Sequence, residues 1–140
     1  MRLVVDTDVV VAGMRSPTGA SAALLVLLLK RQATMLLSVA LAFEYEAVCL
    51  MAEHRLAAGA SELDVQNMID SLVGISEAVD VHYQWRPQLT DAGDEMVLEA
   101  AVNGRADAIV TFNRNDFGVA PSRFGIEVAR PADVLRRIRK

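Results

Sequence analysis

The chain begins with the stretch Leu3-Val4-Val5-Asp6-Thr7-Asp8-Val9-Val10. Its first three residues are apolar and two of them are β-branched, which is typical of a short buried strand ending at Asp6. A carboxylate at the end of a buried strand is costly unless a partner such as a cation compensates its charge. Asp6 is therefore either a metal ligand or a turn residue that caps local amides. Asp8 either joins the same site or is a solvated turn residue.

Strands and helices alternate behind this first strand. The further strands are expected at about 34–39, 78–82, 108–111 and 126–128. The helices are expected at about 21–31, 41–54, 61–73, 94–103 and 132–139, with a turn at 57–60 and a loop at 85–93. Strands separated by helices of this length indicate parallel β-α units. We predict an α/β fold, a three-layer α/β/α sandwich with a central, mainly parallel five-stranded sheet.

The composition indicates one globular domain over residues 1–140. The chain is 53% hydrophobic and 23% charged, with eight Gly and four Pro, which excludes a disordered or collagen-like chain. The longest apolar run, Ala22 to Leu29, is far shorter than the ~20 residues of a membrane span. The single Cys49 cannot form an internal disulfide and suits a reducing compartment. We expect a soluble, cytoplasmic protein with no membrane partner.

The net charge of −4 is unevenly distributed. Residues 130–140 hold five basic groups and one acid, a balance of +4, so the other 129 residues carry −8. An acidic body binds nucleic acid poorly unless divalent ions neutralise part of its charge. The basic tail either contacts a polyanion or is a solvated last helical turn that the helix dipole favours.

Acidic side chains from several segments are expected at one edge of the sheet. Glu44 flanks the apolar face of its helix, Asp94 begins a helix, and Asp116 follows the strand at 108–111. Each has an ordinary alternative: a buried ion pair, a residue favoured by the helix dipole, or a polar turn. Together with Asp6 they would form an oxygen cage for divalent ions of the kind that hydrolyses phosphodiesters. Two histidines and one cysteine do not make a zinc site, so Mg²⁺ or Mn²⁺ is expected.

These residues resemble the PIN domain, and specifically its toxin branch in type II toxin–antitoxin systems. The resemblance runs from residue 2 to about residue 138. The matching pieces are residues 4–9, 38–48 around Glu44, 91–101 around Asp94, 106–113 continuing through Asp116-Phe117, and 126–135.

The resemblance implies a metal-dependent ribonuclease. Asp6, Glu44, Asp94 and Asp116 would be the catalytic acids that hold Mg²⁺ or Mn²⁺, and Thr111 and Asn113 would support them. RNA would be cut to leave a 5′-phosphate and a 3′-hydroxyl. Members of the branch are commonly homodimers that a cognate antitoxin silences, so both partners are implied.

Two positions depart from the pattern of the family. The family usually has Asn where this chain has Asp8, which adds negative charge beside the first ligand. Many relatives carry an acid where Asn113 stands, and here the next acid is Asp116, three residues later.

Other functions explain the sequence less completely. The opening Asp6-Thr7-Asp8 also fits a haloacid dehalogenase-type phosphatase, but a suitably placed Lys or Arg is missing and Glu44 has no role there. A response-regulator receiver needs a Lys after its fifth strand, and the only lysines are Lys30 and Lys140. A catalytically silent PIN fold that binds RNA or acts as a scaffold stays the non-enzymatic alternative.

Overall fold

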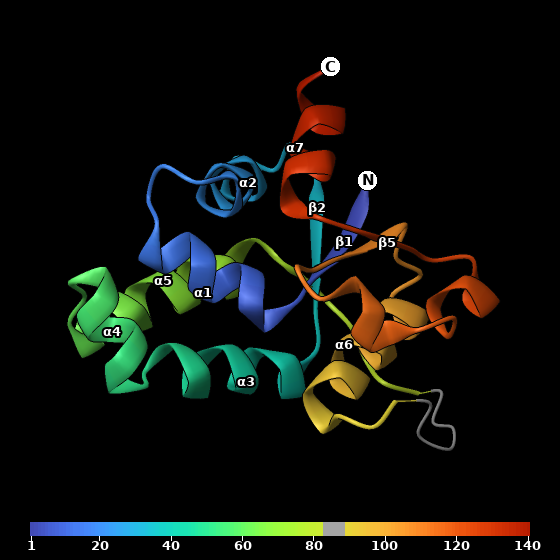
Figure 1. Ribbon diagram of the computed structural model, residues 1–140, viewed down its shortest axis with the longest axis horizontal. Helices are drawn as coiled ribbons and strands as arrows, with labels where there is room; N and C mark the ends of the chain where they lie inside the picture. Colours follow the sequence, from blue (N-terminus) through green and yellow to red (C-terminus); the bar gives the residue numbers. More distant parts are fainter. Residues whose placement is uncertain (83–88) are drawn as a thin grey trace.

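A five-stranded, all-parallel sheet forms the centre of the fold (Figure 1). The computed structural model describes residues 1–82 and 89–140. Along the chain the elements are β1 (Arg2–Val5), α1 (Thr7–Arg15), α2 (Ala20–Leu29), β2 (Thr34–Leu37), α3 (Val39–Cys49), α4 (Ala52–Ala58), α5 (Glu62–Ile75), β3 (Glu77–Ala78), α6 (Ala92–Asn103), β4 (Ala108–Val110), two 3₁₀ turns, η1 (Arg114–Phe117) and η2 (Pro121–Phe124), β5 (Glu127–Ala129) and α7 (Pro131–Arg139). The strand order is β3-β2-β1-β4-β5. The predicted α/β/α fold with a parallel five-stranded sheet is confirmed.

The central strand β1 is buried on both faces. Leu3, Val4 and Val5 have no exposed surface, as expected for a parallel strand covered by helices on both sides. Val4 lies opposite Ile109 of β4, while Leu3 also pairs with Met35 of β2. Figure 1 shows α6 on the opposite side of the strands from α1, α2, α3 and α5. The residues after β1 and β4 therefore meet at one edge of the sheet.

Helix α1 was not predicted. The segment after Asp6 reads as a turn followed by β-branched residues, but it folds as a helix whose N-cap is Asp6. Val9, Val10 and Val11 are buried in the core, and this burial outweighs the modest helix propensity of valine. The helix places Asp8 in its first turn, close to Asp6.

The predicted helix at 41–54 is two helices, α3 and α4. The break falls at Leu50 and Met51, and the guanidinium of Arg55 donates from Nε to the carbonyl of Leu50 at 3.0 Å. Satisfying that carbonyl with a side chain allows the chain to turn without glycine or proline. The helix at 61–73 is confirmed and extends to Ile75, with a capping box between Ser61 and Asp64.

The predicted strand at 78–82 is wrong in its extent. Strand β3 covers only Glu77–Ala78, and Val79 adds one more bond by donating to the carbonyl of Leu37 at 3.0 Å. Its neighbour β2 ends there because Ser38 caps α3 by accepting from the amide of Leu41, which leaves no strand for a longer β3 to pair with. Residues 85–88 of the predicted loop at 85–93 lie outside the described residues, and α6 begins at Ala92 with Asp91 as N-cap.

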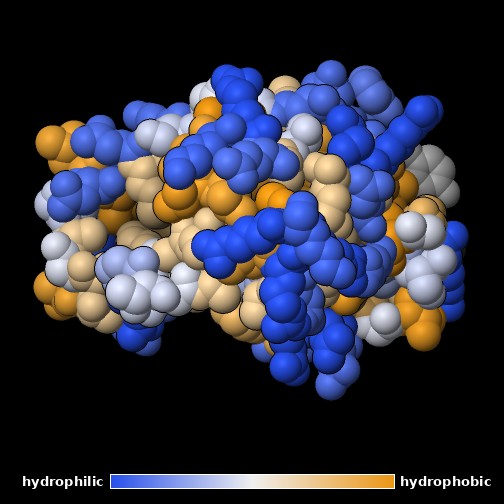
Figure 2. Space-filling view, turned by 90° about the horizontal axis from the view of Figure 1, so that it is seen from above, coloured by the Kyte–Doolittle hydropathy of each residue, from blue (hydrophilic) through white to orange (hydrophobic). Residues whose placement is uncertain are grey.

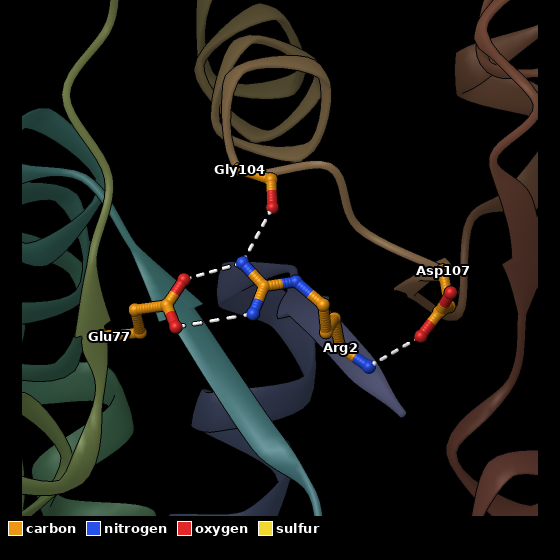
Figure 3. Close-up of polar contacts among 4 residues, drawn as sticks. All are labelled: Arg2, Glu77, Gly104 and Asp107. Carbon is orange, nitrogen blue, oxygen red and sulfur yellow. Dashed lines mark hydrogen bonds and ion pairs between the residues drawn. The ribbon is translucent and has the colours of Figure 1, made fainter.

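Arg2, the first residue of β1, joins three segments at the amino end of the strands (Figure 3). Its guanidinium pairs with both carboxylate oxygens of Glu77 on β3 and donates to the carbonyl of Gly104 at 2.8 Å. Its amide donates to the carboxylate of Asp107 at 2.7 Å. These contacts fix the edge strand β3 and the segment between α6 and β4 relative to β1.

The basic tail is partly paired. On α7, Arg136 forms an ion pair with Asp133 and Arg137 with Glu127 of β5. Figure 2 looks onto the face that carries α2 and α7 and shows hydrophilic side chains gathered over α7. The last turn of α7 holds basic residues where the helix dipole favours them, which agrees with the solvated-helix alternative.

Among the described residues, no single helix is long and apolar enough to cross a membrane. Helices α1 and α2 reach the length and apolar composition of a membrane span only when they are counted together, and they are bent by 104° relative to each other.

Candidate active site

Asp6 lies at the carboxyl end of β1, where the strand passes into α1. Its amide donates to the carbonyl of Val110 in β4 at 2.9 Å, and its side chain is only 8% exposed. The hydroxyl of Thr111, the first residue after β4, donates to Oδ2 of Asp6 at 2.7 Å. Because β1 and β4 are neighbours in the sheet, residues 105 positions apart in the chain are held in direct contact.

The segment Thr111–Asn113 holds Asp6 and Asp8 together. The amide of Asn113 donates to Oγ1 of Thr111 at 3.0 Å, which leaves the single hydroxyl proton of Thr111 for a carboxylate. Oδ2 of Asp8 accepts from the amide of Phe112 and from Nδ2 of Asn113, each at 3.1 Å. The predicted supporting residues Asp8, Thr111 and Asn113 therefore form one hydrogen-bonded group with Asp6.

The second oxygen of Asp8 has no partner. Oδ1 of Asp8 and Oγ of Ser21 are the two buried side-chain atoms in the described residues that lack a hydrogen bond. A buried acceptor without a donor costs about 1–3 kcal/mol, and more when it carries charge. An oxygen held in this way beside other carboxylates is suited to a cation.

Asp94 lies in the first turn of α6 and is half-buried. The N-cap of that helix, Asp91, accepts from the amides of Gly93 and Asp94 at 2.8 and 3.1 Å. Burial, together with the negative charges of Asp6, Asp91 and Asp116, raises the pKa of Asp94 to about 6. Asp91 thus satisfies the first amides of α6, and the nearby carboxylates disfavour the ionised form of Asp94.

The remaining pKa shifts agree with a cluster of negative charges. Burial raises the pKa of Asp6 to about 6, with the charge of Asp8 adding to the effect and the Thr111 hydrogen bond opposing it. Burial likewise raises the pKa of Asp8, and the charge of Asp94 adds to the shift. These acids destabilise one another's ionised forms, and a cation between them would relieve that cost.

Glu44 and Asp116 border the cluster. Glu44 on α3 is half-buried, and its Oε1 lies 3.7 Å from the position that a Cβ on Gly93 would occupy, so it faces the first turn of α6. Asp116 lies in η1 and is exposed, but its charge contributes to the raised pKa of both Asp6 and Asp94.

The sequence matches a family model described as the PIN domain over residues 2–115. This chain belongs to the PIN domain family. No curated protein and no solved structure matches it. Because PIN domains are generally nucleases, the match supports a nuclease-type fold and a hydrolase acting on nucleic acid. The matched region contains Asp6, Glu44 and Asp94 and ends one residue before Asp116.

Two buried polar residues of this PIN domain escaped the sequence analysis. Tyr45 counts as part of an apolar helical stripe by its spacing, but its buried hydroxyl donates to the carbonyl of Val5 and so fixes α3 against the end of β1. Burial raises the pKa of Tyr45 well above its usual value, with the charge of Asp6 adding to the shift, so the group stays a neutral donor. Glu95, 8% exposed, accepts from the amide of Leu89 at 2.9 Å.

The carboxylates of the PIN domain are neighbours without forming a closed ligand set. Within residues 1–82 and 89–140, no group of three or more His, Cys, Asp or Glu side chains is arranged so that it could hold a metal ion as it stands. Their chemistry nevertheless fits a hard divalent ion, because the donors are oxygens, one of them is unpartnered, and three of the acids have raised pKa values.

Proposed function

We propose that this PIN domain is a divalent-metal-dependent endoribonuclease, the toxin of a toxin–antitoxin pair, that hydrolyses RNA phosphodiester bonds. The proposed metal ligands are Asp6, Glu44, Asp94 and Asp116, with Asp8, Thr111 and Asn113 as supporting residues. The cofactor is Mg²⁺ or Mn²⁺, since every donor is an oxygen.

The observation that carries the proposal is uncompensated negative charge at the carboxyl edge of the sheet. The pKa values of Asp6 and Asp94 both rise to about 6, and Oδ1 of Asp8 is buried without a donor. Divalent ions bound there would supply water activation and stabilisation of the leaving oxygen in phosphodiester hydrolysis. Ligands are often found at this edge of parallel sheets, where loops from several strands meet.

The residues around the acids have separate roles in this proposal. Thr111 fixes the orientation of Asp6 by donating to one oxygen, which leaves the other available. The amide of Phe112 and Nδ2 of Asn113 hold Oδ2 of Asp8 by two hydrogen bonds, which orient the carboxylate and leave Oδ1 without a protein donor. Asp8 would thereby contribute an oxygen to the cation, in addition to its supporting role.

The proposed protein partners are a cognate antitoxin and a second copy of the chain. Both rest on the resemblance to the toxin branch and on apolar side chains left exposed on α3, α4 and α5. Those more than 60% exposed are Val39, Phe43, Leu56 and Leu63. The cytoplasm is the proposed location because the lone Cys49 is free and buried.

The test is cleavage of a mixed pool of structured and unstructured RNA with Mn²⁺, with Mg²⁺ and with EDTA. Wild-type protein is expected to cut only with a divalent ion, and Asp6→Asn and Asp94→Asn are expected to lose the activity. Asp70→Asn is the matched control, because Asp70 is an exposed acid on α5. Cutting that survives EDTA, or that persists in Asp6→Asn and Asp94→Asn, would contradict the proposal. RNA binding without metal binding or cutting would favour the silent module instead.

A further inference from the structure

An open cavity of about 270 Å³ lies beside the acids, on the side of η1 and α7. Its lining consists of Phe112, Asn113, Arg114, Asn115, Asp116 and Arg130. Five of these six residues are polar or charged, and η1 lies against β5, which brings Arg114 near Arg130 at the end of that strand. The cavity thus combines two arginines and one aromatic ring with a residue of the acidic cluster.

Phe112 is the one apolar residue of this cavity and its side chain is 45% exposed. Its amide is bonded to Asp8 and its neighbour Thr111 is bonded to Asp6. The ring is therefore tethered directly to the acids, since consecutive Cα atoms are only ~3.8 Å apart. An aromatic face held in this way offers a stacking platform at a fixed place beside the acidic cluster.

Arg114 and Arg130 place two positive charges beside the acidic cluster. Both are exposed, and within the described part of the chain neither side chain forms an ion pair or a hydrogen bond. Several other arginines are paired: Arg2, Arg136 and Arg137 each have an acidic partner. Free guanidinium groups beside a cluster of acids are suited to the phosphates that flank a bound nucleotide.

We propose that this cavity is a nucleotide subsite for unpaired RNA, in which a base stacks on Phe112 and Arg114 and Arg130 bind the adjacent phosphates. An unpaired base is required because the faces of paired bases are covered in a duplex, whereas loops and single strands expose them. The inference rests on the proposed function, because it assigns the position of the substrate at the same site. The arginines favour RNA over an apolar protein segment as the occupant.

The test measures binding of a fluorescein-labelled single-stranded decaribonucleotide, and of a hairpin stem of matched composition, by fluorescence anisotropy. The Asp94→Asn protein is used so that the RNA stays intact. Phe112→Leu keeps an apolar side chain but removes the aromatic face, and is expected to weaken single-strand binding about 5- to 100-fold. Phe112→Trp is expected to retain the affinity, and Phe124→Leu, an exposed Phe in η2 that does not line the cavity, is the control.

The arginines are tested by the salt dependence of the same binding. Arg114→Gln and Arg130→Gln are each expected to lower the slope of log K against log salt by about 0.7, while the control Arg139→Gln leaves it unchanged. Equal affinity of Phe112→Leu and the parent protein for the single strand would overturn the inference, as would an equal loss for the stem. The thermal midpoint of each variant identifies any loss that is due to unfolding.

Cleavage by the wild-type protein separates the two proposals. If that protein cuts RNA with Mn²⁺ while Phe112→Leu binds and cuts normally, the nuclease stands and the subsite fails. If no divalent ion supports cutting but binding still depends on Phe112, the subsite stands and the nuclease fails.

Discussion

Replacing Asp6 by Asn is expected to stabilise the metal-free protein while abolishing its proposed activity. Asp6 is 8% exposed, and burial together with the charge of Asp8 raises its pKa to about 6 from 3.8. Two pKa units correspond to about 3 kcal/mol of unfavourable free energy in the ionised folded state. Asn is nearly isosteric, and its carbonyl oxygen still accepts the hydroxyl of Thr111. Neighbouring acids can also lower this cost in the wild type by shifting position or binding protons. We therefore expect the free energy of unfolding of Asp6→Asn to exceed that of the wild type by about 1–3 kcal/mol at pH 8.

The pH dependence gives this prediction its sign. The folded-state pKa of Asp6 lies above its unfolded value, so folding takes up a proton between about pH 4 and pH 6. The stability that the neutral carboxyl contributes is fully present below about pH 4 and is lost as the pH rises through 6. In Asp6→Asn that part of the pH dependence disappears, so the two proteins differ most above pH 6.

Thermal unfolding in EDTA from pH 4 to pH 8 measures the effect. For a chain of this length, about 1–3 kcal/mol corresponds to a rise in Tm of about 3–10 °C at pH 8. Mn²⁺ at 100 times its Kd should stabilise the wild type by about 2.7 kcal/mol and so raise its Tm. The Tm of Asp6→Asn should stay nearly unchanged by Mn²⁺. Asp70→Asn controls for the loss of one surface charge. A variant that is less stable than the wild type at pH 8 in EDTA would refute the argument that Asp6 carries an uncompensated charge.

Three further predictions test the hydrogen bonds of the site. Thr111→Val removes the donor to Asp6 and is expected to cost about 1.5–3 kcal/mol at pH 8 by urea unfolding, with Thr111→Ser close to wild type. Tyr45→Phe removes the buried bond from α3 to the end of β1 and is expected to cost about 0.5–1.5 kcal/mol in the same assay. Asp8→Asn and Asn113→Asp are each expected to reduce Mn²⁺ affinity by calorimetry, and the double exchange is expected to restore it; a double variant weaker than both single ones would contradict this.

The sequence predicts those parts of the fold that depend on local patterns. Hydrophobic β-branched runs identified β1 and β4, and the helix predicted at 61–73 matches α5, which begins at a capping box between Ser61 and Asp64. Helix α1 was missed because consecutive valines favour a strand, and only the tertiary core around them decides for a helix. The length of β3 was wrong because it depends on where its neighbour β2 ends, which no residue within 78–82 reports.

The candidate site was predictable to a different depth for each residue. Asp6 could be chosen as a candidate site residue because it ends a buried strand. The position of Thr111 next to Asp6 follows from the pairing of β4 with β1. The hydroxyl of Tyr45 could not be chosen in this way, since a helical stripe of apolar residues gives a tyrosine no reason to point its oxygen at a backbone carbonyl. The unpartnered Oδ1 of Asp8 also depends on two donors, the amide of Phe112 and Nδ2 of Asn113, which come from a segment more than 100 residues away and bind Oδ2.

One contact joins the two positions at which the sequence departs from the pattern that its resemblance to the PIN toxin branch implies. Asp8 stands where the family usually has Asn, Asn113 stands where many relatives have an acid, and Nδ2 of Asn113 donates to Oδ2 of Asp8 at 3.1 Å. Exchanging the acid and the amide across this hydrogen bond keeps the number of charges near Asp6 constant while moving one of them from the β4 edge to the first turn of α1. In the proposed site, the unpartnered Oδ1 of Asp8 would offer that charge to a cation, so Asp116, exposed in η1, would not be the only acid contributed beside Asp6, Glu44 and Asp94.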